Sequence, residues 1–259
     1  MRLYFKFVLM FIKSEMEYKL AFFLSMVAST LGTLVTVLGI VFLLQKFGSV
    51  GGWKIEEVML ITGIAIFGYT CVEIFLRGLD MLYTRVKSGI LDQMMTRPRK
   101  ILFQVACSDF QMHKIGRLLE SIILIIYGLI NVNVEWNIYK VFVFVLVLIA
   151  SNIVFAALQI LKAAFCFWTI DGMELMNILQ DGGRDLSSYP LSIYKEWFAK
   201  FFTYIIPFGL CTYYPIMYLL GKDDAPFWYG LTPILVIPFM LAMLGVWNIG
   251  LRNYKSTGS

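Results

Sequence analysis

The sequence predicts an all-α integral membrane protein, and three observations support that prediction. Hydrophobic residues make up 59% of the 259 residues and charged residues only 15%, whereas soluble domains are about 25% charged. Several apolar segments are long enough, at about 1.5 Å per helical residue, to cross a hydrocarbon core about 30 Å thick. The basic residues lie between these segments rather than on one continuous face, which argues against nucleic acid as a partner.

The first 19 residues combine cations with aromatic side chains ahead of the first long apolar segment. Lys6, Lys13 and Lys19 are interspersed with rings such as Phe7 and Phe11. Side chains of these two kinds suit the boundary between lipid and water. Residues 1–19 are therefore expected to form an amphipathic helix lying in the membrane interface. The alternative is a cytoplasmic extension of the first span.

Six membrane-spanning helices are expected in residues 20–259. Four of them are assigned to single apolar segments, at residues 20–44, 58–76, 114–130 and 230–249. Residues 138–176 are apolar over too great a length for one span, so they predict two spans with a tight turn somewhere within 151–162. Both termini are placed in the cytoplasm, because the cytoplasmic segments then hold most of the Lys and Arg residues.

Small residues recur on one face of the first expected span, at alternating steps of four and three. They are Ser25, Ser29, Gly32, Thr36 and Gly39, and this spacing places them together on a helix. Small side chains let helices approach each other closely in lipid. The face is expected to pack within the chain, to lie at a subunit interface or to line a transport pathway, and the sequence leaves these alternatives open.

Residues 85–100 hold the densest cluster of positive charge in the chain. The cations are Arg85, Lys87, Arg97, Arg99 and Lys100, balanced only by Asp92. This stretch lies between two expected spans and is too short to be a domain of its own. It is therefore expected to be a surface that contacts a cytoplasmic partner. Gly89 and Pro98 bound a short helix predicted at about 90–96. The alternative is a positive-inside anchor without a partner.

Residues 180–229 are expected to lie outside the cell. Residues 180–188 are polar and contain two glycines, which predicts a break between helices. Residues 191–202 show amphipathic spacing typical of a helix at an interface. The apolar run that follows is interrupted by Pro207 and Pro215, so it is expected to dip into the membrane and return rather than to span it.

Catalytic and cofactor-binding patterns are missing from the sequence. His113 is its only histidine, and the four cysteines are scattered without the spacing of metal ligands. There is no P-loop and no recognisable catalytic set. The chain is therefore expected to be neither an enzyme nor a nucleotide-binding protein, and to hold no cofactor of its own.

Three segments together resemble the permeases of ABC-2-type transporters, in a bacterial branch of unknown function. They are Ser88-Gly-Ile-Leu-Asp-Gln-Met-Met-Thr-Arg-Pro98, Tyr189-Pro-Leu-Ser-Ile-Tyr194 with Ile206-Pro-Phe and Tyr214-Pro-Ile after it, and Tyr254-Lys-Ser-Thr-Gly258. The resemblance covers nearly the whole chain. Arg99 departs from the pattern, because an apolar residue is more usual after Pro98.

The resemblance implies six spans, an interfacial N-terminal helix and extracellular re-entrant helices before the last span, here at about 180–229. It also implies pairing with a second permease chain, as a homodimer or a heterodimer. A separate ATPase would bind ATP and Mg²⁺ and dock on a coupling helix at about 89–97. The residues that match this helix are Gly89, Ile90, Leu91, Asp92, Gln93, Met94, Met95 and Arg97.

The expected function is that of the permease subunit of an ABC exporter in the bacterial plasma membrane, in contact with membrane lipid and without nucleic acid. Its cargo would be an amphipathic drug, peptide or lipid-linked molecule. A stand-alone secondary transporter or channel is the alternative. It is disfavoured because the charges are expected at span ends, with Glu73 and Arg77 spaced to pair with each other. An intramembrane enzyme is disfavoured by the missing catalytic set.

Overall fold

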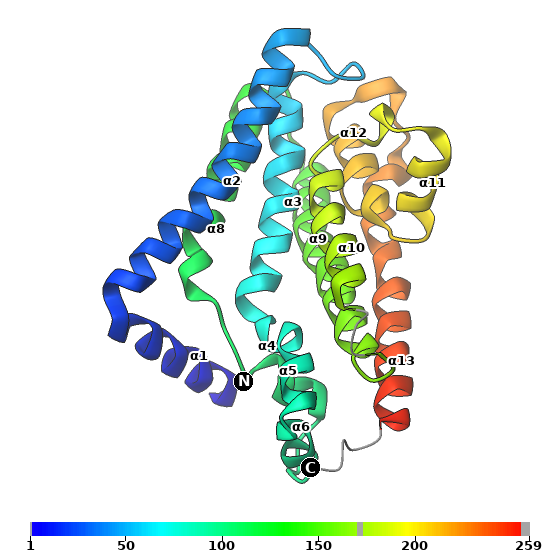
Figure 1. Cartoon of the computed structure of the whole chain (residues 1–259). Helices are drawn as coiled ribbons and strands as arrows, with labels where there is room; N and C mark the ends of the chain where they lie inside the picture. Colours follow the sequence, from blue (N-terminus) through cyan, green and yellow to red (C-terminus); the bar gives the residue numbers. More distant parts are fainter. Residues whose placement is uncertain (1, 170–172, 255–259) are drawn as a thin grey trace.

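The computed structural model describes residues 2–169 and 173–254, which form helices without a β-strand (Figure 1). Long helices lie side by side along the molecule, and short helices gather at its two ends. The long helices are α2 (Lys19–Phe47), α3 (Ile55–Phe75), α8 (Ile115–Asn131), α9 (Ile138–Phe165), α10 (Met173–Ser187) and α13 (Val236–Asn253). Contacts join α2 to α8, α8 to α3, α3 to α9, α9 to α13, and α10 to both α3 and α9.

Four helical stretches are long and apolar enough to cross a membrane, which confirms the all-α membrane class. They are Val8–Phe47, Ile55–Phe75, Ile138–Phe165 and Phe227–Asn253. The last of these joins the 3₁₀ helix η6 (Phe227–Leu235) to α13. α8 is apolar but has 17 residues, and α10 has 15 residues with several charged side chains. α8 and α10 belong to the bundle, but neither is both long and apolar enough to count among the four candidate spans.

The predicted turn within residues 151–162 is wrong, because α9 is a single helix of 28 residues. The polar residues that suggested a turn have partners inside the bundle. Ser151 Oγ donates to the Ile64 carbonyl at 3.2 Å, and Asn152 Nδ2 donates to the Leu148 carbonyl at 2.8 Å. With these hydrogen bonds made, nothing in α9 requires the chain to leave the helix for water.

The predicted break at residues 180–188 is also wrong, because residues 180–187 belong to α10. α10 runs antiparallel to α3: Tyr69 donates to Asp181 at 2.6 Å, and Thr62 donates to the Ser188 carbonyl at 2.9 Å. The glycines favour packing rather than a loop. A Cβ on Gly183 would lie 2.7 Å from Cε2 of the buried Phe208 ring, so only glycine lets α10 approach this ring.

The segment after α10 folds into short helices at the upper end of Figure 1. They are η3 (Leu191–Ile193), α11 (Glu196–Tyr204), η4 (Gly209–Tyr213), α12 (Tyr214–Leu220) and η5 (Lys222–Asp224). The α11 segment and the η4–α12 segment are bent by 81° at a break that contains Pro207. A break was predicted in this run, and the bend agrees with it; that the run dips into the membrane and returns stays a prediction. An ion pair of 2.6 Å between Lys222 and Glu57 ties this end to the start of α3.

Short helices between α3 and α8 occupy the opposite end, beside the end of α13 (Figure 1). They are α4 (Arg77–Asp80), α5 (Leu82–Lys87), α6 (Ile90–Met95), α7 (Ile101–Ala106) and η2 (Met112–Lys114). α1 (Arg2–Glu15) lies at the same end, at a steep angle to α2, to which η1 (Met16–Tyr18) joins it. That α1 lies in a membrane interface stays a prediction.

Candidate functional site

The predicted short helix after the second span is confirmed as α6. It starts after Gly89, whose φ of 69° lies in the left-handed region that suits glycine. Ile90, Gln93 and Met95 are exposed, whereas Leu91 is fully buried and Met94 is 9% exposed. The exposed residues, with Arg97 beyond them, form the outer face of α6. Asp92 is half-buried.

Leu91 and Met94, two of the residues that match the coupling helix, are not available to a partner. Both side chains pack into the core of their own chain, in a cluster that includes Leu82, Val105 and Trp247. Residues three apart share a face of a helix. The face of α6 that contains Leu91 and Met94 is therefore already covered by this chain's own core. A partner is left with the outer face of α6.

Polar contacts fasten α6 to the helices around it. Gln104 on α7 donates to the carbonyls of Met94 at 3.0 Å and Arg99 at 2.9 Å. Arg85 on α5 donates to the Ser108 carbonyl at 3.1 Å and also to the Ser108 hydroxyl. Tyr254, the residue after α13, packs against the cluster that contains Leu91 and Met94, which places the end of α13 close to α6. The segment from α4 to α7 is therefore one packed unit.

The small-residue face of α2 is open in the single chain. Ser25, Gly32, Thr36 and Gly39 are exposed and Ser29 is half-buried. An added Cβ at Gly32 or Gly39 would meet no atom within 4 Å. Packing within the chain, one of the three alternatives, is therefore excluded at these two glycines.

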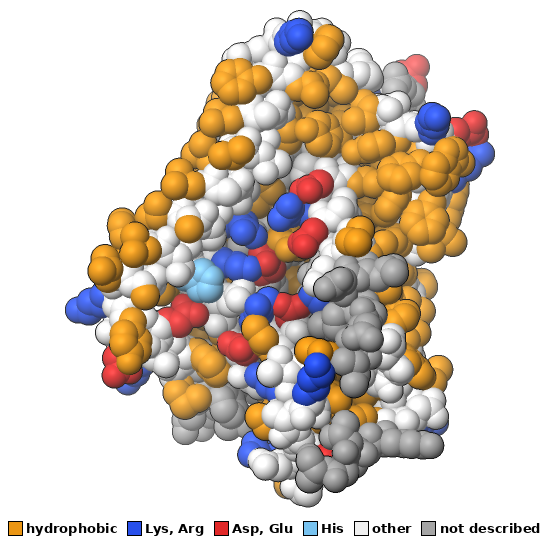
Figure 2. Space-filling view, viewed as in Figure 1, with side chains coloured by type: hydrophobic (Ala, Val, Ile, Leu, Met, Phe, Trp, Pro, Cys, Tyr) orange, Lys and Arg blue, Asp and Glu red, His pale blue; other side chains and the backbone are white. Residues whose placement is uncertain are grey.

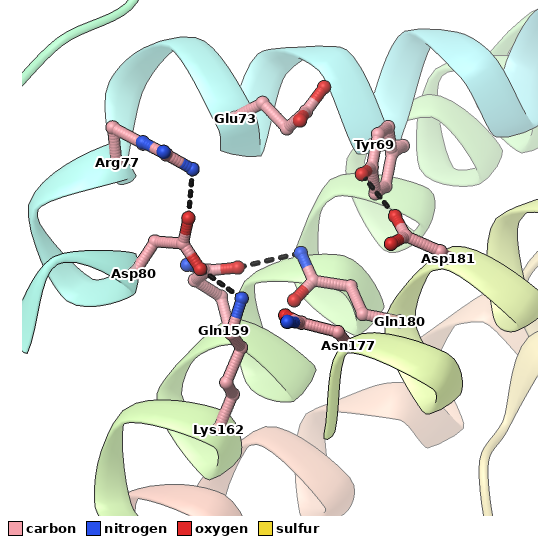
Figure 3. A pocket seen from close by; sticks show the side chains of 9 residues that line it. All are labelled: Tyr69, Glu73, Arg77, Asp80, Gln159, Lys162, Asn177, Gln180 and Asp181. Atoms are coloured by element: carbon pink, nitrogen blue, oxygen red, sulfur yellow. Dashed lines mark hydrogen bonds and ion pairs between the residues drawn. The ribbon is translucent and has the colours of Figure 1, made fainter. Parts of the chain in front are cut away.

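A polar cavity of about 230 Å³ lies among α3, α4, α9 and α10 (Figure 3). No pattern in the sequence had predicted it. Its lining residues are all polar or charged: Tyr69, Glu73, Arg77, Asp80, Gln159, Lys162, Asn177, Gln180 and Asp181. Four separate segments of an apolar chain thus direct their polar side chains into one space.

Ion pairs surround this cavity. Asp80 on α4 accepts from both Arg77 and Lys162, and Lys162 lies near the end of α9 (Figure 3). Glu73 accepts from Lys114 and Arg117 at the start of α8. The predicted pairing of Glu73 with Arg77 is therefore wrong: each of them pairs with a residue brought close by the fold. Through Asp80 and Lys162, α4 is linked directly to α9.

The upper wall of the cavity contains a tyrosine held between α3 and α10. The Tyr69 hydroxyl donates to Asp181 Oδ1 at 2.6 Å (Figure 3). The Arg184 guanidinium lies 5.0 Å from the centre of the Tyr69 ring, and it also pairs with Asp185 at 2.7 Å. α3 and α10 are thus held together by polar groups at this level.

Gln180 projects into the cavity with one side-chain atom unsatisfied. It is 5% exposed, and its Nε2 donates to Gln159 Oε1 at 2.6 Å. Its Oε1 has no hydrogen-bond partner among the described residues, and the same holds for the buried Nε of Arg77. Leaving such groups unpaired costs about 1–3 kcal/mol each, so water or a ligand is expected to bind there.

The outer face of α10 is polar and exposed. Asn177, Asp181 and Asp185 recur every four residues, and all three are exposed. The contacts of Tyr69 and Thr62 place Asp185 opposite the middle of α3. Charged side chains are costly against lipid, so inside a membrane this face would have to contact water or protein. Figure 2 shows charged side chains gathered at the centre of this side of the molecule. The expectation that charges lie only at span ends is therefore wrong.

The sequence does contain a signal for the cavity, in two runs of polar residues that are far apart in the chain. Tyr69 and Glu73 on α3 and Arg77 at the start of α4 recur every four residues, as do Asn177, Asp181 and Asp185 on α10. Each run marks a polar face on a helix. Their meeting depends on α10 being a helix, which the two adjacent glycines concealed.

The cavity provides hydrogen-bond donors, acceptors and charge, but no arrangement typical of catalysis. No group of three potential metal ligands occurs in the described residues. The carboxylates of Glu73 and Asp80 are occupied by cations. The geometry therefore fits a polar passage or binding site.

A family model described as ABC-2 family transporter protein matches residues 30–258. No curated protein matches, and no solved structure matches. The matched region runs from α2 past the end of α13 and includes α6 and the polar cavity. The chain belongs to the ABC-2 transporter family, whose members are the transmembrane component of ABC transporters.

Proposed function

We propose that this chain is the permease subunit of an ABC exporter, and that a separate ATPase docks on α6 and drives cargo along the polar face of α10. The observation that carries this proposal is the packed segment from α4 to α6. At one end it presents the exposed Ile90 and Met95, and at the other it places Asp80 in the polar cavity. Movement of α6 would thus be transmitted to Asp80, and through Lys162 to α9.

The proposed topology has both termini and α4–α7 in the cytoplasm of a bacterium, with six crossings of the plasma membrane. α2, α3, α8, α9, α10 and α13 provide the crossings, and the α11–α12 region lies on the outer side. Support comes from the basic residues 85–100, since cations are retained in the cytoplasm.

A second permease chain would complete the structure. The polar face of α10 avoids lipid, and the open face of α2 lacks a partner. A second copy or a related chain placed against these faces would shield both and enclose a pathway between them. Cargo in such a pathway would meet charge on α10 and apolar side chains such as Val35 and Phe42 on α2. This combination suits an amphipathic molecule.

Docking of the ATPase is tested by placing charge on the outer face of α6. The Ile90→Asp/Met95→Asp variant should insert normally but lose co-purification with a co-expressed ABC ATPase, because both positions are exposed in the chain and would be buried in the complex. Ile193→Asp, at an exposed position at the other end of the molecule, is the matched control. Equal recovery of the ATPase with both variants would refute the docking site.

A stand-alone secondary transporter remains a second candidate, because charged residues do lie opposite the middle of α3. The two functions differ in energy source. Export by the complex in inverted vesicles should require ATP hydrolysis and persist after the ion gradients are collapsed. Transport that continues without ATP and stops with an ionophore would favour the secondary transporter.

A further inference from the structure

A second cavity, separate from the polar one, lies between α1 and the α6–α7 segment. Its volume is about 310 Å³, and apolar walls are provided by Met10 and Phe11 on one side and Met94 and Phe103 on the other. Water is poorly held by apolar walls, since each ordered molecule needs two to four polar partners. The shape and chemistry of the cavity therefore suit a partly apolar ligand.

Two arginines, Arg97 and Arg99, also line this cavity. Both are exposed, and neither forms an ion pair within the described part of the chain. None of the described residues that line the cavity is acidic. Guanidinium groups bind phosphate through a planar fork of donors. The charge-complementary ligand is therefore an anion, and phosphate fits it best.

One wall of the cavity is α1, which is held in place by contacts with the segment before α8. Phe11 packs on Phe110, with ring centres 5.4 Å apart. Glu15 accepts a hydrogen bond of 3.1 Å from the backbone N–H of His113. α1 is thereby attached to the segment that leads into α8, and Figure 1 shows it across the lower end of the bundle. In the proposed topology this is the level of the cytoplasmic lipid headgroups.

We propose that this cavity binds an anionic phospholipid of the cytoplasmic leaflet. Its phosphate would pair with Arg97 and Arg99, and the first part of an acyl chain would lie between α1 and Phe103. Free phosphate would leave the apolar walls against water, and a neutral lipid would add no net charge to balance the arginines. The bound lipid would connect α1 to the segment that carries α6. This inference concerns lipid binding alone and does not depend on an ATPase.

The test measures lipid bound to the purified full-length chain in nanodiscs of phosphatidylcholine with increasing phosphatidylglycerol, by native mass spectrometry. An arginine near anionic lipid contributes about a fivefold change in affinity, so Arg97→Gln/Arg99→Gln is expected to bind phosphatidylglycerol about 25-fold more weakly. Lys87→Gln/Arg252→Gln is the matched control, because it removes two exposed cations that do not line the cavity. It is expected to bind like the wild type.

A second variant tests the apolar part of the site without changing charge. Met10→Trp should fill the cavity from the exposed side and reduce binding of phosphatidylglycerol. Equal losses in the arginine variant and in the Lys87/Arg252 control would overturn the proposal, because binding would then be general attraction to the surface. The proposal would also be overturned if the chain bound phosphatidylcholine as tightly as phosphatidylglycerol, or if millimolar inorganic phosphate displaced the bound lipid.

The occupant is identified in cells with a photo-cross-linking benzoylphenylalanine at Phe103. An adduct with the mass of an anionic phospholipid is expected. A protein adduct in its place would show that a partner subunit fills the cavity and would refute the lipid assignment.

Discussion

Two adjacent glycines in α10 provide a test of its packing, because an alanine should have opposite effects at the two positions. Gly182 is exposed, and a Cβ there would meet no atom within 4 Å. Gly183 is buried, and its Cβ would lie 2.7 and 2.8 Å from two atoms of the Phe208 ring. Phe208 is 1% exposed and packs against Phe155, so its ring has little room to move.

The magnitudes follow from helix propensity and overpacking. Replacing glycine by alanine inside a helix contributes about 1 kcal/mol of stability, so Gly182→Ala should stabilise the chain by that amount. At Gly183 the same gain is opposed by overpacking of about 1–3 kcal/mol, which gives a net change between about zero and 2 kcal/mol of destabilisation. The two variants should therefore differ by about 1–3 kcal/mol.

The assay is reversible unfolding of the purified chain in mixed micelles, followed by circular dichroism as the denaturing detergent is increased. Phe208→Ala serves as the background for a second comparison, because it removes the ring that Gly183→Ala would meet. In that background Gly183→Ala should become stabilising. Equal effects of the two alanines in the wild-type chain would refute the packing of α10 against Phe208.

Three further predictions concern the coupling segment, the ion pairs and the α2 face. Leu91→Asp should lower the yield of folded protein in gel filtration, because Leu91 is fully buried and an unpaired charge there costs several kcal/mol. A stable variant that is defective only in ATPase binding would contradict the burial of Leu91. Lys162→Met should destabilise the chain by about 3 kcal/mol in the same unfolding assay, because Asp80 loses a buried partner. Most of that loss should disappear in an Asp80→Asn background. Additive effects of the two substitutions would exclude the pairing. Gly32→Leu should leave the unfolding of a single chain unchanged but reduce recovery of the second permease chain in pull-downs, and normal pairing would exclude the α2 face as the interface.

The class of the protein and its apolar elements could be predicted because span length and hydrophobicity are properties of local sequence. The α6 helix could be predicted for a similar reason, since Gly89 and Pro98 mark its limits regardless of what packs around it. The bend at Pro207 followed from the inability of proline to continue a helix. These features need no knowledge of neighbouring helices.

α10 and the polar cavity could not be predicted, because their stability comes from neighbours distant in sequence. Gln180 is acceptable inside the bundle because Gln159 accepts its hydrogen bond. Asp181 is stabilised by Tyr69, and Gly183 is required by Phe208. Taken alone, these residues have the composition of a loop. For the same reason the faces of α6 could be assigned only once Leu91 was seen inside the core.

The central claim is that an ATPase on α6 controls the polar face of α10, and Gly182→Cys measures this directly. The position is exposed on α10, directly after Asp181, and has open space around it. In a Cys71→Ala background, the rate of reaction with a charged, membrane-impermeant thiol reagent would be measured with the ATPase bound, with and without ATP. ATP is expected to change the rate several-fold, and Ile90→Asp/Met95→Asp is expected to abolish the change. A rate unaffected by ATP in the intact complex would contradict control of α10 by an ATPase on α6.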